Sequence, residues 1–400
     1  MPLPPNKLRK FQHAPPISPS VKASLAMAAP ESSLPKEFSW RNPADVAIVL
    51  PGASFKLTTP VNQEDCGNCW ACSTITALGD RVQIALARKT PGFTLDVALP
   101  LSIAWMTSCN DYCANDNCVS GCDGADIGTA LSFLSLEFGN GVPFASCLPL
   151  PVGTYANPMG EYRDKFATKL AKCQSETQIH EKCLAETAKC GACAVATRDS
   201  GIFIKSGSLQ KIKDALTIKQ EVYINGPVPA GYKVYPDFEV EGGYSNNDGI
   251  YIHKGPDSSD GAGFHAVVIV GWGEKIVDLN GTKSTISFWE VRNSWGTQWG
   301  DGGFWKHAMR DDKLLVNLEC GMEGYQEDTY TGGVVSFFPE IRAIKKSVAV
   351  PASEKEKKTG KNIISQPEKI ESSAKSFFQK YYIIITIVLV VLFFLFFSIL

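Results

Sequence analysis

Residues 63–76 read QEDCGNCWACSTIT, and this stretch decides the fold more than any other part of the chain. Cys69 is followed by Trp70 and then by small, helix-compatible residues, so the sequence predicts a thiol at the beginning of a helix. The first amide groups of a helix lack intrahelical partners and its dipole is positive there, so both favour a thiolate over a thiol. We therefore expect Cys69 to be a reactive nucleophile.

A nucleophilic thiol needs a base, and the chain has five histidines. His265 begins the run HAVVIVGWG (265–273), which predicts a buried strand followed by a tight turn. Asn293, in the stretch VRNSWG, follows a second predicted strand at 287–292. An amide side chain can hold an imidazole in one orientation through the ring N–H. The three patches in this order predict a site in which Cys69 is the nucleophile and His265 its acid–base partner.

The chain resembles the papain family of cysteine peptidases over about residues 34–330. The resemblance implies an α+β fold of two subdomains, with a helical left half (about 55–153) and a β-barrel-like right half (about 201–324) and the active-site cleft between them. The cathepsin B branch is the most similar, because three further stretches resemble it: NGPVPAGYKVYPDF (225–238), GFHAVVIVGWG (263–273) and ECGMEG (319–324).

The resemblance assigns a role to each residue of the expected catalytic group. Cys69 is the nucleophile, His265 the acid–base partner and Asn293 the orienting residue. The side-chain amide of Gln63 and the backbone N–H of Cys69 form the oxyanion hole, where losing one donor typically costs about 10²–10³ in rate. Trp295 stands where the family shields the Asn–His contact from water.

The resemblance also marks residues expected to contact substrate. In GCDGAD (121–126), Gly124 and Ala125 match the glycine pair that hydrogen-bonds the substrate backbone, and Ala125 narrows this shelf because it replaces a glycine. Gly263 and Phe264 precede the expected catalytic histidine and are candidates for the same cleft.

Departures from the family pattern predict how the enzyme differs from cathepsin B. The occluding loop of cathepsin B carries two adjacent histidines, whereas between residues 147 and 193 this chain has only His180, so we expect an endopeptidase. Tyr325 stands at the floor of the second specificity subsite, where it predicts a preference for medium-sized hydrophobic residues. Asn68 replaces the usual serine or alanine. About 33 residues precede the domain, so control by a long propeptide is not expected.

The function implied is hydrolysis of proteins or peptides through an acyl-enzyme on Cys69, with no cofactor and no metal. The net charge of −2 gives no indication of nucleic-acid binding. The alternative is a catalytically silent, membrane-displayed papain-like binding module. The sequence does not indicate an oligomeric state.

Thirteen cysteines are too many for an ordinary cytosolic enzyme and predict disulfide bonds. The resemblance implies a bond between Cys66 and Cys122, and Cys69, Cys72 and Cys320 are expected to be free. Zinc is the alternative for Cys190 and Cys193, which have the two-residue gap of a metal knuckle but no matching second pair. Without Cys69, Cys72 and Cys320, ten cysteines remain, which is enough for five disulfide bonds. The sequence does not say how eight of them pair: Cys109, Cys113, Cys118, Cys147, Cys173, Cys183, Cys190 and Cys193.

The two ends of the chain differ from the expected peptidase domain at 34–345. Residues 1–33 are rich in proline, serine and alanine and predict a disordered segment without a secretory signal. Residues 346–380 are charged and polar and predict a stalk. Residues 381–400 carry no charge and are long enough to span a bilayer as a helix. A removable lipid-anchor signal is the alternative for this tail.

A C-terminal anchor without a signal peptide would leave the peptidase facing the cytosol, where disulfides are normally reduced. One resolution is the virion membrane of a large DNA virus, whose own oxidation system forms disulfides in the cytoplasm. We therefore expect a single-pass membrane location, with a secretory or lysosome-like compartment as the alternative.

Overall fold

The computed structural model describes residues 34–64, 66–90, 92, 94–95, 101–109, 113–114, 117–118, 122, 124–135, 141–143, 145, 201–240, 242–253, 263–317, 320–322 and 333–342. All of them belong to one unit, which ends at Lys345. The predicted N-terminal segment (1–33), stalk (346–380) and transmembrane helix (381–400) lie outside the described residues. No helix among the described residues is both long and apolar enough to cross a membrane.

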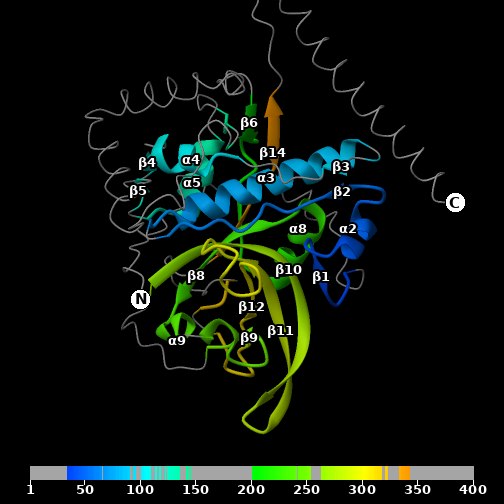
Figure 1. Ribbon diagram of the computed structural model, residues 1–400, viewed down its shortest axis with the longest axis vertical. Coiled ribbons are helices and arrows are strands. Elements are labelled where there is room, and N and C mark those ends of the chain that lie inside the picture. Colours follow the sequence, from blue (N-terminus) through cyan, green and yellow to red (C-terminus); the bar gives the residue numbers. More distant parts are fainter. Residues whose placement is uncertain are drawn as a thin grey trace, which may run out of the picture. The chain divides into compact units, whose positions relative to one another are not determined.

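Helix α3 (Cys69–Lys89) runs through the middle of the molecule, between smaller elements on one side and a large sheet on the other (Figure 1). Every residue from Cys69 to Ile84 is buried, as expected for a helix that other elements surround. The other described elements between residues 34 and 135 are short: β1 (Phe38–Ser39), α2 (Pro43–Val49), β2 (Ser54–Phe55), β3 (Thr94–Leu95), α4 (Ile103–Cys109), β4 (Cys113–Ala114), β5 (Asn117–Cys118) and α5 (Ile127–Leu134).

The large sheet has eight strands in the order β7-β13-β8-β10-β11-β12-β9, with β1 paired to β10 off this path. Its neighbours are antiparallel except for β12 and β9, which are parallel. Within the described residues the sheet stays open, so the expected β-rich half is present without a closed barrel. The strands are β7 (Gln210–Ile212), β8 (Val228–Val234), β9 (Ile250–Tyr251), β10 (Gly263–Leu279), β11 (Thr282–Arg292), β12 (Phe304–Ala308) and β13 (Gly333–Ser336).

Three helical segments accompany this half: α8 (Ala215–Asn225), α9 (Pro236–Glu239) and the 3₁₀ turn η3 (Gly243–Ser245). The last described strand, β14 (Pro339–Arg342), pairs with β6 (Gly201–Ile204) in a separate two-stranded sheet. The predicted limit of the right half at residue 324 was therefore too early, because β13 joins the large sheet after that point.

Strand β10 contributes side chains to the two larger hydrophobic cores. Ala266, Val268 and Val270 pack in the core that contains α3, whereas Val267 and Ile269 pack in the core on the opposite face of the sheet. Successive side chains of a strand point to opposite faces, so a strand covered on both sides reads as a continuous apolar run. The predicted buried strand at His265 is confirmed.

The predicted tight turn after this run is wrong. Strand β10 continues to Leu279, with an irregularity in its pairing to β11 between Ile269 and Gly271. A Cβ atom at Gly271 would collide with the carbonyl oxygen of Phe38 in β1. A Cβ at Gly273 would lie 2.7 Å from the ring of Phe288. These glycines therefore permit close packing rather than a change of direction.

The true turn lies at Asn280 and Gly281, between β10 and β11. Both residues have positive φ, 57° and 86°, which is the conformation that an Asn-Gly hairpin turn requires. The backbone N–H of Gly281 donates to Asp278 Oδ1 at 2.6 Å. The result is a long hairpin that projects from the rest of the sheet (Figure 1).

Two buried ion pairs join α3 to the sheet half. In the first, Asp80 Oδ2 lies 2.7 Å from Arg292 Nη1, at the end of β11. The other carboxylate oxygen accepts hydrogen bonds from the backbone N–H and the hydroxyl of Thr58, at 2.7 and 2.8 Å. Arg292 also donates to the carbonyl oxygen of Thr58 at 3.0 Å.

The second pair joins the next residue of the helix to α8. Arg81 Nη1 lies 2.8 Å from Glu221 Oε1, and both side chains are buried. The guanidinium also donates to the carbonyl oxygens of Pro227 at 2.6 Å and Gly226 at 3.1 Å. Ser336 of β13 donates its hydroxyl to Glu221. Charges at this depth are tolerated only because they are paired and hydrogen-bonded.

We expect Asp80→Ala to destabilise the protein by about 3–5 kcal/mol, because it leaves Arg292 buried without its counter-ion. The free energy of unfolding, from urea denaturation, measures the loss. Asp312→Ala is the matched control: it removes a carboxylate 2.8 Å from Arg310 whose side chain is 72% exposed. This change should cost less than about 1 kcal/mol. Equal losses in the two variants would contradict the assignment.

Candidate active site

Cys69 is the first residue of α3, as predicted. It is buried, with 1% of its surface exposed. The backbone amides of Ala266, Trp70 and Cys69 itself hydrogen-bond its sulfur. Because Ala266 follows His265 in β10, the Cys69 sulfur lies next to the strand that carries His265, although the two residues are far apart in the sequence.

The expected shift of the thiol toward the thiolate is not what the structure gives. Burial raises the pKa of Cys69 from 9.0 to about 11, and the three amides only partly offset this. A helix N-terminus stabilises a charge by typically about 0.3–1 kcal/mol, whereas complete desolvation can shift a pKa by several units. At the beginning of this helix, desolvation outweighs the dipole.

His265 Nε2 lies 2.8 Å from Asn293 Oδ1. Since an amide oxygen only accepts, Nε2 carries the proton and Nδ1 is left as the acceptor nitrogen. The indole of Trp295 stacks on the imidazole with 5.0 Å between ring centroids and an interplanar angle of 25°. The structure thus places Trp295 where it covers the ring. Tyr232 meets the same imidazole edge-on at 6.0 Å, a contact that the sequence did not indicate.

Burial lowers the pKa of His265 from 6.5 to about 4, and the hydrogen bond to Asn293 offsets part of this decrease. Each group of the pair alone therefore favours its neutral form at pH 7. A thiolate and an imidazolium can form together, because the two opposite charges then compensate each other's desolvation.

Gln63 is held at both ends of its side chain. Its Nε2 donates to the carbonyl oxygen of Cys66 at 2.9 Å, and its Oε1 accepts from the hydroxyl of Ser294. A primary amide has two N–H groups, so one N–H of Gln63 is not used by the bond to Cys66.

Ser294 is a residue that the sequence reasoning missed. Its backbone N–H donates to Asn293 Oδ1 at 2.8 Å, and its carbonyl oxygen accepts from the N–H of Gln63 at 2.8 Å. Ser294 therefore connects Gln63, the expected oxyanion residue, to Asn293, the hydrogen-bond partner of His265. The only signal was its position directly after Asn293.

The bond between Cys66 and Cys122 is present, with the Cα atoms 4.6 Å apart. The N–H of Gly67 donates to the carbonyl oxygen of Cys122 at 2.9 Å, so the loop before the nucleophile is fixed beside the expected substrate shelf. On that shelf Gly124 has φ of 93°, in the region that favours glycine, and Ala125 is buried.

Of the other residues predicted to contact substrate, two belong to the described part of the chain and one does not. Gly263 and Phe264 open β10, paired with Val234 and Lys233, and are half-buried. Tyr325 lies outside the described residues, as do Cys190 and Cys193 of the zinc alternative.

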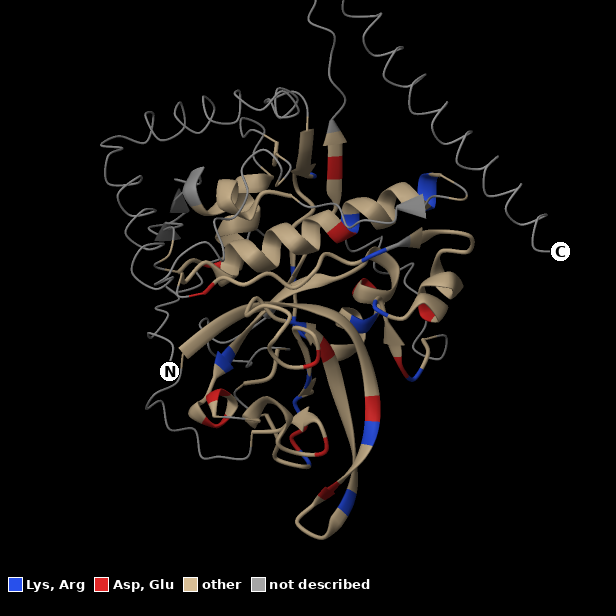
Figure 2. Cartoon of the chain, viewed as in Figure 1, with Lys and Arg blue, Asp and Glu red and all other residues tan. Residues whose placement is uncertain are grey.

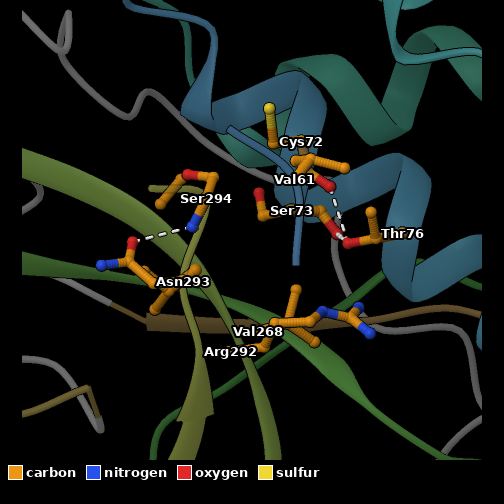
Figure 3. Close-up of a pocket in the computed structure, with 10 residues that line it drawn as sticks. Val61, Cys72, Ser73, Thr76, Val268, Arg292, Asn293 and Ser294 are labelled. Atoms are coloured by element: carbon orange, nitrogen blue, oxygen red, sulfur yellow. Dashed lines mark hydrogen bonds between the residues drawn. The ribbon is translucent and has the colours of Figure 1, made fainter. Parts of the chain in front are cut away.

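A small cavity lies behind this site, between α3 and the ends of the strands (Figure 3). Its volume is about 10 Å³, which is room for about one water molecule. Figure 3 shows Cys72, Ser73 and Thr76 along the helix and Asn293 and Ser294 at the end of the strand. No pattern in the sequence indicated this cavity.

Residues 34–330 match the family described as papain family cysteine protease, and the chain belongs to that family. It is 26% identical over 295 residues to cathepsin B-like cysteine proteinase 6 of Caenorhabditis elegans, across 71% of this chain and 62% of that protein. It is 26% identical over 345 residues to probable cysteine proteinase 024R of Invertebrate iridescent virus 3, across 78% of this chain and 65% of that protein. Both matches span less than two thirds of the relative.

Among solved structures, proCathepsin B S9 from Trypanosoma congolense is 21% identical, with a TM-score of 0.49. The match covers 85% of this chain and 87% of that one.

In the Cys69→Ala variant the charge that would compensate an imidazolium is gone, so we expect His265 to stay neutral down to about pH 4. Histidine ring resonances followed by NMR across a pH titration measure this, with the Cys69→Ala, His265→Gln double variant identifying the signal. A midpoint near 6.5, the ordinary value, would show that burial does not control this imidazole.

Proposed function

We propose that this protein is a cysteine endopeptidase that acts through Cys69, His265 and Asn293. The observation that carries the proposal is the 2.8 Å contact between His265 and Asn293, on the strand whose next residue hydrogen-bonds the Cys69 sulfur. Membership of the papain family supports it.

Catalysis would begin with transfer of the Cys69 proton to Nδ1 of His265 as the thiolate attacks a peptide carbonyl. Gln63 and the Cys69 amide would then stabilise the oxyanion of the tetrahedral intermediate. The imidazolium, held by Asn293, protonates the departing amine, and water releases the acyl group from Cys69. No step in this sequence uses a cofactor.

We propose endopeptidase action, with a preference for medium-sized hydrophobic residues at the second subsite. The proposal rests on the single histidine between residues 147 and 193 and on Tyr325 at the expected subsite floor. The relatives include proteins named as cathepsin B-like, and the missing histidine pair is the ground for expecting a different mode from cathepsin B itself.

An epoxysuccinyl inhibitor should label the purified full chain at one residue, Cys69, and the Cys69→Ala variant should remain unlabelled. Gln63→Ala should still be labelled, but its rate of peptide hydrolysis should fall by a factor of about 10²–10³, because the variant lacks one oxyanion donor. Mass spectrometry of the labelled peptide and hydrolysis of peptides blocked at both ends provide the two measurements.

Blocked peptides also test the mode and the subsite, because a dipeptidyl carboxypeptidase requires a free carboxyl terminus. Phe-Arg or Leu-containing peptides should be cleaved faster than Arg-Arg peptides. If the inhibitor does not label the folded, reduced protein and the protein cleaves no peptide, a catalytically silent binding module explains the chain better. Equal cleavage of both kinds of peptide would refute the subsite preference alone.

We also propose that residues 381–400 anchor the chain in a membrane, with the virion membrane of a large DNA virus as the specific location. The support is the uncharged C-terminal run after a polar segment, and a viral protein is among the relatives. The full chain should resist alkaline extraction from membranes, and deletion of 381–400 should release it. Loss of the tail from the mature mass would indicate the lipid-anchor alternative, and extraction of the intact chain would contradict both.

A further inference from the structure

The proposed mechanism leaves one buried nucleophile unused. Cys72 follows Cys69 by three residues in the sequence Cys-Trp-Ala-Cys, and both are free and buried. The two residues share the first turn of α3. A Cys-X-X-Cys pair at the N-terminus of a helix is the arrangement in which thiols exchange with disulfides.

Helix geometry brings the two side chains onto the same face. Residues three apart in a helix have Cβ atoms about 5–6 Å apart, slightly more than the 3.5–4.5 Å of a disulfide. The remaining difference requires only a local adjustment of the first turn, where a helix is least constrained.

The Cys72 side chain contacts the residue that precedes Cys69 in the chain. Its sulfur lies 3.8 Å from Oδ1 of Asn68, the residue that precedes Cys69. Asn68 makes no side-chain capping bond to the helix and instead donates Nδ2 to Thr107 Oγ1 at 3.0 Å. The Cys72 sulfur therefore lies against the residue that caps the helix, at the end where Cys69 begins it.

The small cavity described above lies beside Cys72. Cys72 lines it together with Ser73 and Thr76 (Figure 3). In a close-packed interior, a rotamer change of a buried side chain requires such a space. Electrostatics favours the neutral thiol before oxidation, since burial and the neighbouring Cys69 both raise the pKa of Cys72.

We propose that Cys69 and Cys72 form a two-cysteine redox site, whose oxidant is a peroxide and whose product is a Cys69–Cys72 disulfide. The disulfide would block the nucleophile reversibly and protect it from irreversible oxidation.

The chemistry proceeds in three balanced steps. The Cys69 thiolate attacks one oxygen of hydrogen peroxide, the O–O bond breaks, and the hydroxide released takes the proton from His265 to give water. The Cys72 sulfur then attacks the sulfenic sulfur of Cys69, an S–S bond forms, and the hydroxyl leaves with the Cys72 proton as a second water. A dithiol reductant restores both thiols by exchange and is itself oxidised to a disulfide.

This inference rests on the proposed function, because it needs Cys69 to be reactive. Its test measures the mass of the oxidised peptide and not the hydrolysis of a substrate. Full-length protein is treated with hydrogen peroxide, the remaining thiols are alkylated, and the peptide containing Cys69 and Cys72 is weighed. We expect that peptide to lose two hydrogens and to regain them with dithiothreitol. Labelling by the epoxysuccinyl inhibitor should disappear and return in parallel.

The variant Cys72→Ser cannot form the disulfide, so its Cys69 should gain two oxygens and should not recover labelling. Cys72→Ala is the second variant if the serine does not fold. Cys320→Ser is the matched control, because it removes another buried cysteine elsewhere in the fold. Cys320→Ser should behave as the wild type.

Identical irreversible oxidation of the wild type and both Cys72 variants would overturn the proposal. A bond from Cys69 to any cysteine other than Cys72 would also overturn it. A protein that forms the disulfide but cleaves no peptide would retain this inference while losing the proposed function, so the two failures are distinguishable.

Discussion

Two consecutive charged residues in the middle of α3 fix the position of this helix against the sheet half. Asp80 pairs with Arg292 and Arg81 pairs with Glu221, in each case over distances below 3 Å and away from water. Arg292 is the residue directly before Asn293, so the first pair connects the helix that Cys69 begins to the strand end beside the hydrogen-bond partner of His265. The two pairs therefore fix the position of α3 relative to the end of β11 and to α8. A buried pair of this kind contributes specificity of arrangement more than net stability.

Local pattern explains which parts of the site were predictable from sequence. The cysteine at a helix start and the apolar strand after His265 each follow from a few adjacent residues and their periodicity. The Asp80–Arg292 pair does not, because its members are 212 residues apart and a charged residue within a helix normally indicates a solvent-exposed face. The predicted turn after His265 failed for a related reason. Glycine signals both turns and close packing, and only the position of β1 shows that Gly271 serves packing.

The electrostatics of the site could not be read from sequence either. The position of Cys69 at a helix N-terminus was correct, but the conclusion about its charge was not, because the cost of desolvation depends on everything that covers the sulfur. In this structure the same burial acts on the thiol and the imidazole in opposite directions and stabilises the uncharged state of both.

The long β10–β11 hairpin has a consequence for how this protein can be handled in the laboratory. Its outer part is exposed and carries charges of both signs, and its turn at Asn280 and Gly281 lies outside the hydrophobic cores (Figure 2). Exposed loop tips accept inserted sequence, and each doubling of loop length costs only about 0.6 kcal/mol. A fluorescent label or affinity peptide inserted at this turn would leave both chain termini unmodified. The protein could then be purified and imaged without any change to residues 381–400.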